Sequence, residues 1–193
     1  DSERTMCTFL GIAGKIHEKD VDERLVKKSE ITFLEGYLWD EGDPKKAFDK
    51  AINSSNKVAM SLSDLFCVER HKKEFLELVK NRLDIVFANE QEILSLIDGS
   101  SIEDEINFSK EIDKNIIITR GADGAIAVKN KEIFQCNAKS NLNLVDLTGA
   151  GDLFAAGYLH GIINNLSIDE ALYNGTNLSS KVIQQIGARI KNN

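Results

Sequence analysis

The residues with the clearest chemical potential lie together in the segment Leu144-Val145-Asp146-Leu147-Thr148-Gly149-Ala150-Gly151-Asp152. Gly149 and Gly151 permit backbone angles that are closed to residues with side chains, and a ligand can approach their main chain closely. A helix is expected to begin directly after this turn. Its first amides have no intrahelical partners and lie at the positive end of the helix dipole. Such a helix end is a natural seat for phosphate.

Asp152 needs its own explanation, because a carboxylate in an anion-binding turn repels phosphate. A general base that takes a proton from an attacking hydroxyl would account for it. The alternative is structural, since Asp is a favoured N-cap residue and Gly a common turn former. Two glycines and two aspartates at one strand-to-helix junction favour the catalytic interpretation.

Two further segments place polar residues at the ends of expected strands. Asn89 and Glu92 would face one side of a helix start, where they could orient metal-bound water. A plain helix cap with acidic first-turn residues is the alternative. Thr119, Gly121 and Gly124 follow the next strand and would bring a nucleotide phosphate close to the backbone, although a tight β-turn explains them equally well.

The elements that must position these residues alternate between strand and helix. Apolar β-rich runs predict strands over 31–34, 58–62, 84–88 and 115–119, and the runs 125–128 and 132–136 predict a hairpin. Helical spacing predicts helices from Pro44, over 75–83, and over 150–164 and 168–186. The repeated β-α-β order predicts an α/β fold, a mostly parallel sheet with helices on both faces. Ligands in such sheets bind beyond the carboxyl ends of the strands.

Composition limits the class of protein. A chain of 193 residues with 42% hydrophobic and 28% charged residues is expected to form a single α/β domain over 1–193. The net charge of -7 argues against general nucleic-acid or membrane-surface binding. Three scattered cysteines without a C-x-x-C pair are typical of reduced thiols in a cytoplasmic protein. No signal-peptide pattern and no apolar run of bilayer-spanning length are found.

Other phosphate-binding motifs fit poorly. The spacing Gly149-Ala150-Gly151 imitates a dinucleotide-binding fingerprint, but that motif requires a following strand with an acidic residue about 20 positions on. Helix is expected here up to the end of the chain. No G-x-x-x-x-G-K-[ST] P-loop and no protein-kinase H-R-D or D-F-G element is present.

Three motifs together carry a family resemblance. The stretch 146–152 resembles the D-x-T-G-A-G-D signature of the ribokinase-like (PfkB) carbohydrate kinase family. Asn89-x-x-Glu92 and Thr119-x-Gly121-x-x-Gly124 resemble the family's other two C-terminal motifs, in the same order. The resemblance extends from about residue 3 to residue 189. The stretches 3–6 and 36–40 are most similar to the adenosine-kinase-like branch.

The resemblance implies an ATP-dependent kinase that phosphorylates a hydroxyl of a sugar or nucleoside. Asp152 would be the catalytic base, and the amides of Gly149, Ala150 and Gly151 would form the anion hole for the transferred phosphoryl group.

The resemblance also implies the cofactor and ion contacts. Magnesium and its waters would be organised by Asn89 and Glu92. The nucleotide site would be formed by Thr119, Gly121, Gly124 and Asn177, the last of which has helix packing as its alternative role. A monovalent cation such as K⁺ would be held near the anion hole by Asp146, Thr148 and carbonyls around Val182, Gln185 and Gly187.

The family's N-terminal portion has no counterpart in the sequence. That portion supplies early strands, a glycine-rich sugar-binding loop, an acidic residue that grips the acceptor and most of the lid. We therefore expect the chain to begin within the lid, with residues 1–13 as its remnant. An inactive nucleotide-binding or structural remnant is the rival to the kinase interpretation. The oligomeric state implied by the family is a monomer or homodimer.

Overall fold

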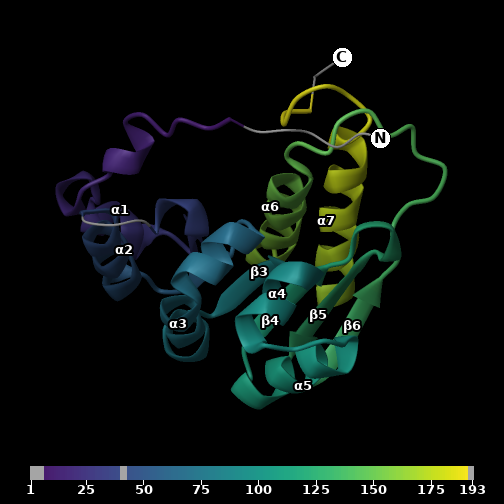
Figure 1. Cartoon of the computed structure of the whole chain (residues 1–193), viewed down its shortest axis with the longest axis horizontal. Coiled ribbons are helices and arrows are strands. Elements are labelled where there is room, and N and C mark those ends of the chain that lie inside the picture. The colour runs from purple at the N-terminus through teal and green to yellow at the C-terminus, as the bar shows by residue number, and fades with distance from the viewer. Residues whose placement is uncertain (1–6, 40–42, 191–193) are drawn as a thin grey trace. The chain divides into compact units, whose positions relative to one another are not determined.

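Figure 1 shows the element order in the structure, a computed structural model that describes residues 7–39 and 43–190. Six strands form one sheet in the order β1-β2-β3-β4-β5-β6. The pairs β1/β2 and β2/β3 are parallel. The strands are β1 (Thr32–Glu35), β2 (Val58–Ser61), β3 (Ile85–Asn89), β4 (Asn115–Thr119), β5 (Ala125–Lys129) and β6 (Glu132–Cys136). The predicted α/β fold with a mostly parallel sheet is confirmed.

The chain divides into two compact units, which are described one at a time. The N-terminal unit holds Phe9–Ile118 and Val128–Glu132. The C-terminal unit holds Thr119–Ala127 and, among the other described residues, 7–8 and 133–190.

The N-terminal unit is built from parallel strands and the helices that connect them. Its helices are α1 (Glu23–Lys28), α2 (Asp43–Ser54), α3 (Leu65–Asn81), α4 (Glu90–Ile97) and α5 (Ile102–Ile112). Thr32 of β1 is in register with Val58 of β2, and Ala59 of β2 with Ile85 of β3. Strands β2, β3 and β4 are almost wholly buried, as their unbroken apolar runs predict for central strands of a parallel sheet. The core contains Trp39, Phe48, Met60, Leu62, Phe75, Val86, Ile93, Leu96, Ile116 and Ile118.

The expected lid remnant, residues 1–13, is described only in part. Residues 1–6 lie outside the described residues, as does Asp40, so the motif at 3–6 has no structural account. The apolar run over residues 8–13 is not a buried element, because Phe9 is 95% exposed and Ile12 84% exposed. A short 3₁₀ helix, η1 (Ala13–Lys15), ends it.

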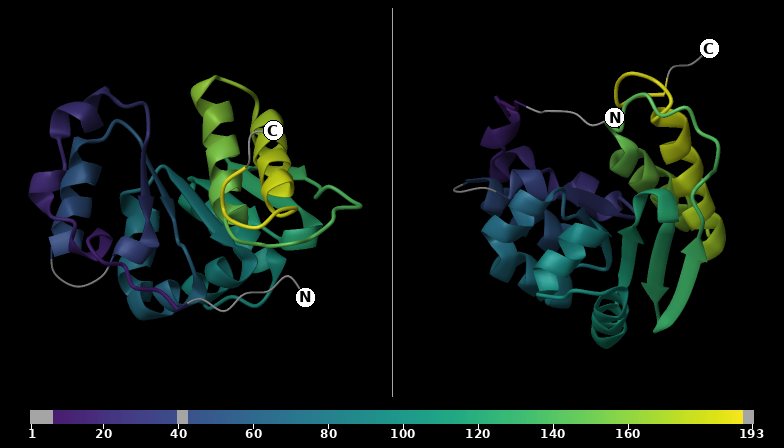
Figure 2. Two further views of the ribbon diagram at one scale, coloured as in Figure 1. Left: turned by 90° about the horizontal axis from the view of Figure 1, so that it is seen from above. Right: turned by 45° about the vertical axis from the view of Figure 1, so that its right-hand side comes forward.

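Two long helices dominate the C-terminal unit, α6 (Ala150–Ile163) and α7 (Ile168–Val182). They lie side by side in the views of Figure 1 and Figure 2. Their close approach depends on glycine, since a Cβ at Gly157 would lie 2.6 Å from the Asn174 carbonyl oxygen. A Cβ at Gly175 would lie 2.8 Å from the Phe154 carbonyl oxygen. This packing holds the start of α6 beside the second half of α7.

The predicted hairpin is confirmed by the neighbouring strands β5 and β6. The turn residues Asn130 and Lys131 both have positive φ, 51° and 64°, as expected for a type I′ connection.

Two predicted boundaries in the C-terminal unit were wrong. The run Leu144–Val145 is not a strand, because the amides of Val145 and Asp146 donate to the carbonyl of Ile183, at 2.9 and 3.3 Å. The junction before Gly149 is therefore loop-to-helix. Helix α7 ends at Val182 and does not reach residue 186, since the chain turns at this point to receive those two amides.

Candidate active site

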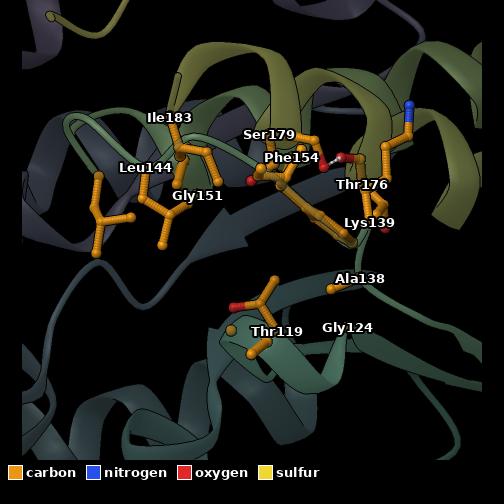
Figure 3. A pocket seen from close by; sticks show the side chains of 16 residues that line it. Thr119, Gly124, Ala138, Lys139, Leu144, Gly151, Phe154, Thr176, Ser179 and Ile183 are labelled. Carbon is orange, nitrogen blue, oxygen red and sulfur yellow. Dashed lines mark hydrogen bonds between the residues drawn. The ribbon is translucent and has the colours of Figure 1, made fainter. Parts of the chain in front are cut away.

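A cavity of about 460 Å³ lies within the C-terminal unit (Figure 3). Its walls come from the β4–β5 turn, the loop over residues 137–149, the start of α6 and one side of α7. The lining residues are Thr119, Gly121, Ala122, Gly124, Ala138, Lys139, Leu142, Leu144, Leu147, Ala150, Gly151, Phe154, Thr176, Ser179, Ser180 and Ile183. The lining is mostly apolar with few polar groups, the usual character of a small-molecule site.

The glycine turn predicted to bind phosphate forms one wall of this cavity. Gly149 caps α6 with φ 81°, in the left-handed region that favours glycine. A Cβ at Gly149 would also lie 2.8 Å from Ala188 Cα, so the position is closed by packing as well as by conformation. Gly151 differs, because a Cβ there would meet no atom within 4 Å. The space beside Gly151 is open to a ligand.

The amides at the start of α6 are partly available for an anion. The Ala150 amide donates to the Leu147 carbonyl at 3.2 Å. In the described part of the chain, the Gly149 and Gly151 amides have no acceptor. No side chain caps α6 either. Two free amides at the positive end of a 14-residue helix can bind an anionic oxygen.

Asp152 occupies the first turn of α6 and is exposed. Among the residues that the structure describes, none donates a hydrogen bond to its carboxylate or forms an ion pair with it. It is therefore not the N-cap that the structural alternative proposed, since Gly149 holds that position. An exposed carboxylate without a structural partner is available for proton transfer.

Asp146 ties the turn to the segment that follows α7. Its Oδ1 accepts the Thr148 amide at 2.9 Å, and its Oδ2 accepts the Gly187 amide at 2.9 Å. These bonds bring together three of the residues predicted near a monovalent cation. The other two are joined separately, since the Gln185 amide donates to the Val182 carbonyl at 3.3 Å.

The predicted nucleotide-binding residues of the β4–β5 turn all line the cavity. Thr119 ends β4, and the 3₁₀ helix η4 (Gly121–Asp123) follows. Gly121 and Gly124 have φ of 55° and 87°. The segment is thus both a tight turn, as its structural alternative predicted, and a wall of the cavity.

Asn177 is not among the residues that line the cavity. Its Oδ1 accepts a hydrogen bond from Lys139 Nζ, which links α7 to the loop over residues 137–149. Sequence reasoning did not single out Lys139, because its contact spans 38 residues and the loop has no periodic pattern. Phe154 was also missed, although its position three residues after Gly151 places it on the same helix face.

Asn89 and Glu92 belong to the N-terminal unit and form a capping box at the start of α4. The Glu92 amide donates to Asn89 Oδ1 at 2.8 Å. In return, the Asn89 amide donates to Glu92 Oε2 at 3.0 Å, and Asn89 Nδ2 to Glu92 Oε1 at 2.7 Å. The helix cap weighed as an alternative is thus present.

Glu92 is an unusual cap residue, because it is only 5% exposed. Burial raises the pKa of its carboxyl to about 7. The hydrogen bond from the Asn89 amide works against this shift, whereas the negative charge of Asp64 adds to it. A buried carboxyl group with such a pKa is a candidate for a functional role.

Residues 7–39 and 43–190 were searched for metal sites and for helices that could span a membrane. No group of three or more His, Cys, Asp or Glu side chains is arranged there to hold a metal ion. None of the helices there has the length and apolar content needed to cross a bilayer.

Comparison with known proteins agrees with the three motifs. Residues 1–193 match the description "pfkB family carbohydrate kinase". The chain is 27% identical over 210 residues to adenosine kinase of Schizosaccharomyces pombe, covering 98% of this chain and 62% of that protein. It is 26% identical over 182 residues to 5-dehydro-2-deoxygluconokinase of Geobacillus kaustophilus, covering 88% of this chain and 54% of that protein.

A solved structure shows the same fold. Adenosine kinase from Sinorhizobium meliloti matches with a TM-score of 0.88 and 36% identity, covering 91% of this chain and 55% of that one. The chain therefore spans between about half and two thirds of the length of these relatives. The predicted ribokinase-like fold and the similarity to adenosine kinases are confirmed. From its motifs, fold and relatives, the chain belongs to the pfkB family of carbohydrate kinases.

Proposed function

We propose that this chain carries the phosphoryl-transfer half of an ATP-dependent kinase that acts on a hydroxyl of a sugar or nucleoside. One observation carries the proposal above the others. The cavity of the C-terminal unit ends at the start of α6, where the Gly149 and Gly151 amides have no acceptor within the described structure and Asp152 is exposed beside them. An anion site and a base are thus adjacent in the chain.

Each group has a defined task in this proposal. The apolar wall that includes Phe154 and Leu147 receives the nucleotide and excludes water. The Gly149 and Gly151 amides stabilise negative charge on the phosphoryl oxygens as it develops. Asp152 accepts the proton of the acceptor hydroxyl, whose oxygen then forms the new bond to phosphorus as the bond to ADP breaks.

Magnesium fits the residues of the N-terminal unit through water. Carboxylate and amide oxygens are ligands that Mg²⁺ prefers, and the ion keeps several of its waters. Asn89 holds both Glu92 oxygens in place through hydrogen bonds, and each carboxylate oxygen keeps a further lone pair that could accept from water bound to the ion. In phosphoryl transfer, magnesium supplies neutralisation of phosphate charge.

The class of acceptor molecule is inferred from the names of the related proteins. Their names include a nucleoside kinase and a kinase of a sugar acid, so a panel must contain both kinds of alcohol. The test is a coupled ADP-release assay with Mg-ATP and adenosine, other nucleosides, ribose, fructose and 5-dehydro-2-deoxygluconate. Turnover that depends on one acceptor supports the proposal and identifies the substrate. ADP release that no acceptor stimulates contradicts it.

A second candidate is nucleotide binding without turnover by the 193-residue chain. The observation that favours it is that the chain spans only 62% and 54% of the length of the two curated relatives compared above. Binding of Mg-ATP measured by calorimetry, together with no ADP release for any acceptor, would support this candidate.

A further inference from the structure

Lys139 is the only charged side chain among those that line the cavity within the described structure. Its Nζ does not reach into the space between the turn at Thr119 and α7. Figure 3 shows the side chain rising along α7, away from Thr119. There Nζ donates to Asn177 Oδ1 and lies 5.6 Å from the centroid of the Tyr173 ring. Tyr173 and Asn177 are four residues apart and share one face of α7.

The segment just before Lys139 is fixed on two sides. The Thr176 hydroxyl donates to Cys136 Sγ at 3.7 Å, which joins the end of β6 to α7. On the other side, a Cβ at Gly124 would lie 2.0 Å from the Cys136 carbonyl oxygen, so the β4–β5 turn packs directly on this segment. Lys139 therefore stands where three walls of the cavity meet.

The segment after Lys139 has no comparable support. Within the described structure, residues 140–143 form no hydrogen bond or ion pair with other residues. The next contacts are those of Leu144 and Val145, and the Val145 amide donates to the Ile183 carbonyl. Leu142 and Leu144 line the cavity from this stretch. The position of that wall thus depends on the anchor at each end.

We propose that Lys139 is a positioning residue for the nucleotide: its ammonium group, held by Asn177 and Tyr173, latches the loop over residues 137–149 to α7 and fixes the cavity wall. This inference rests on the proposed function only in naming the ligand as a nucleotide. The latch itself is a property of the free chain. Without the ammonium group, the nucleotide must order the loop as it binds, and its affinity falls.

The test compares Lys139→Met with Lys139→Arg in the 193-residue chain. Methionine keeps an apolar stem but cannot donate to Asn177, whereas arginine keeps both the donor and the cation over Tyr173. Lys80→Met, an exposed lysine of α3, controls for the loss of one surface charge. Hydrogen exchange reports the loop without ligand. Calorimetry with Mg²⁺ and a non-hydrolysable ATP analogue reports nucleotide affinity.

We expect Lys139→Met to speed exchange of the loop amides that have an acceptor, those of Val145, Asp146 and Thr148, about three- to tenfold, the scale of one partly exposed charged contact. The nucleotide Kd should rise by a similar factor, while Lys139→Arg and Lys80→Met stay within twofold of the parent chain. Unchanged exchange in Lys139→Met overturns the latch, whether or not nucleotide binds. Faster exchange with unchanged Kd overturns the positioning role. A parent chain that binds no nucleotide refutes the proposed function, while the exchange result still decides the latch.

Discussion

The two glycines of the turn before α6 are predicted to respond in opposite ways to alanine. Gly149 has φ 81°, and an added Cβ would lie 2.8 Å from Ala188 Cα and 2.9 Å from the Ala188 carbonyl oxygen. Gly151 lies in α6 and lines the cavity, and an added Cβ would meet no protein atom within 4 Å. Gly149→Ala therefore tests the fold of the turn, whereas Gly151→Ala tests the space kept for a ligand.

The expected stability changes follow from these geometries. A side chain in the left-handed region costs roughly 1–2 kcal/mol. Forcing a methyl group against fixed atoms costs typically about 1–3 kcal/mol more. For Gly149→Ala we take about 3 kcal/mol, which lowers Tm by about 6–12 °C in a chain of this size. Gly151→Ala should leave the free energy of unfolding unchanged or raise it by up to about 1 kcal/mol, because alanine favours a helix.

Gly151→Ala, which should keep the stability of the parent chain, is expected to lose activity. Its methyl group would occupy the space beside the free amide, and losing one such donor typically costs about 100-fold in turnover. Thermal unfolding and ADP release with the best acceptor of the panel measure both effects on the same samples. Unfolding of Gly151→Ala at as low a temperature as Gly149→Ala would contradict the open space beside Gly151. Parental turnover in Gly151→Ala would contradict a catalytic use of that space.

Two further predictions concern buried or bridging carboxylates. Folding raises the pKa of Glu92 from its ordinary value of 4.5 to about 7, so the folded state binds its proton more tightly. The free energy of unfolding should therefore fall by about 3 kcal/mol as the pH rises from 4.5 to 7. Glu92→Gln should flatten that part of a pH series of urea unfolding in EDTA, and a slope as steep as the parent's would contradict the assignment. Asp146→Asn keeps one acceptor oxygen for two donors, the Thr148 and Gly187 amides, and should cost about 1–3 kcal/mol in the same assay. A change below about 0.5 kcal/mol would show that the bridge does not stabilise the turn.

Short-range sequence patterns predicted most of the strands and helices. The apolar runs of β2, β3 and β4 were located to within about one residue, because a central parallel strand is buried on both faces and reads as an unbroken apolar run. Helix α6 was also located well, since the glycine turn marks its start. These features depend on neighbours a few residues apart.

The misplaced elements depend on distant partners. The run Leu144–Val145 has the composition of a strand, yet the amides of Val145 and of the following Asp146 donate to the Ile183 carbonyl, about 40 residues away in sequence. The same contact ends α7 early. The role of Lys139 could not be predicted for the same reason, since its partners Tyr173 and Asn177 lie on another element. No short-range pattern encodes such pairings.

The candidate site divides in the same way. Its glycines and Asp152 form a contiguous motif whose chemistry can be predicted from residue types alone. The apolar cavity beside them is assembled from four segments and became apparent only in the structure. Asn177 illustrates the difference, because its contact with Lys139 gives it a structural partner that its sequence neighbourhood does not indicate.

Asp152 is proposed as the base at the anion site of α6. The most direct measurement is ADP release by Asp152→Asn with the acceptor that the parent chain prefers, alongside calorimetric binding of the ATP analogue. Asparagine keeps the shape of the side chain but cannot take up the proton. We predict turnover about 10²- to 10⁴-fold lower, the usual range for loss of a general base, with a nucleotide Kd within twofold of the parent value. Parental turnover in Asp152→Asn would contradict the assignment.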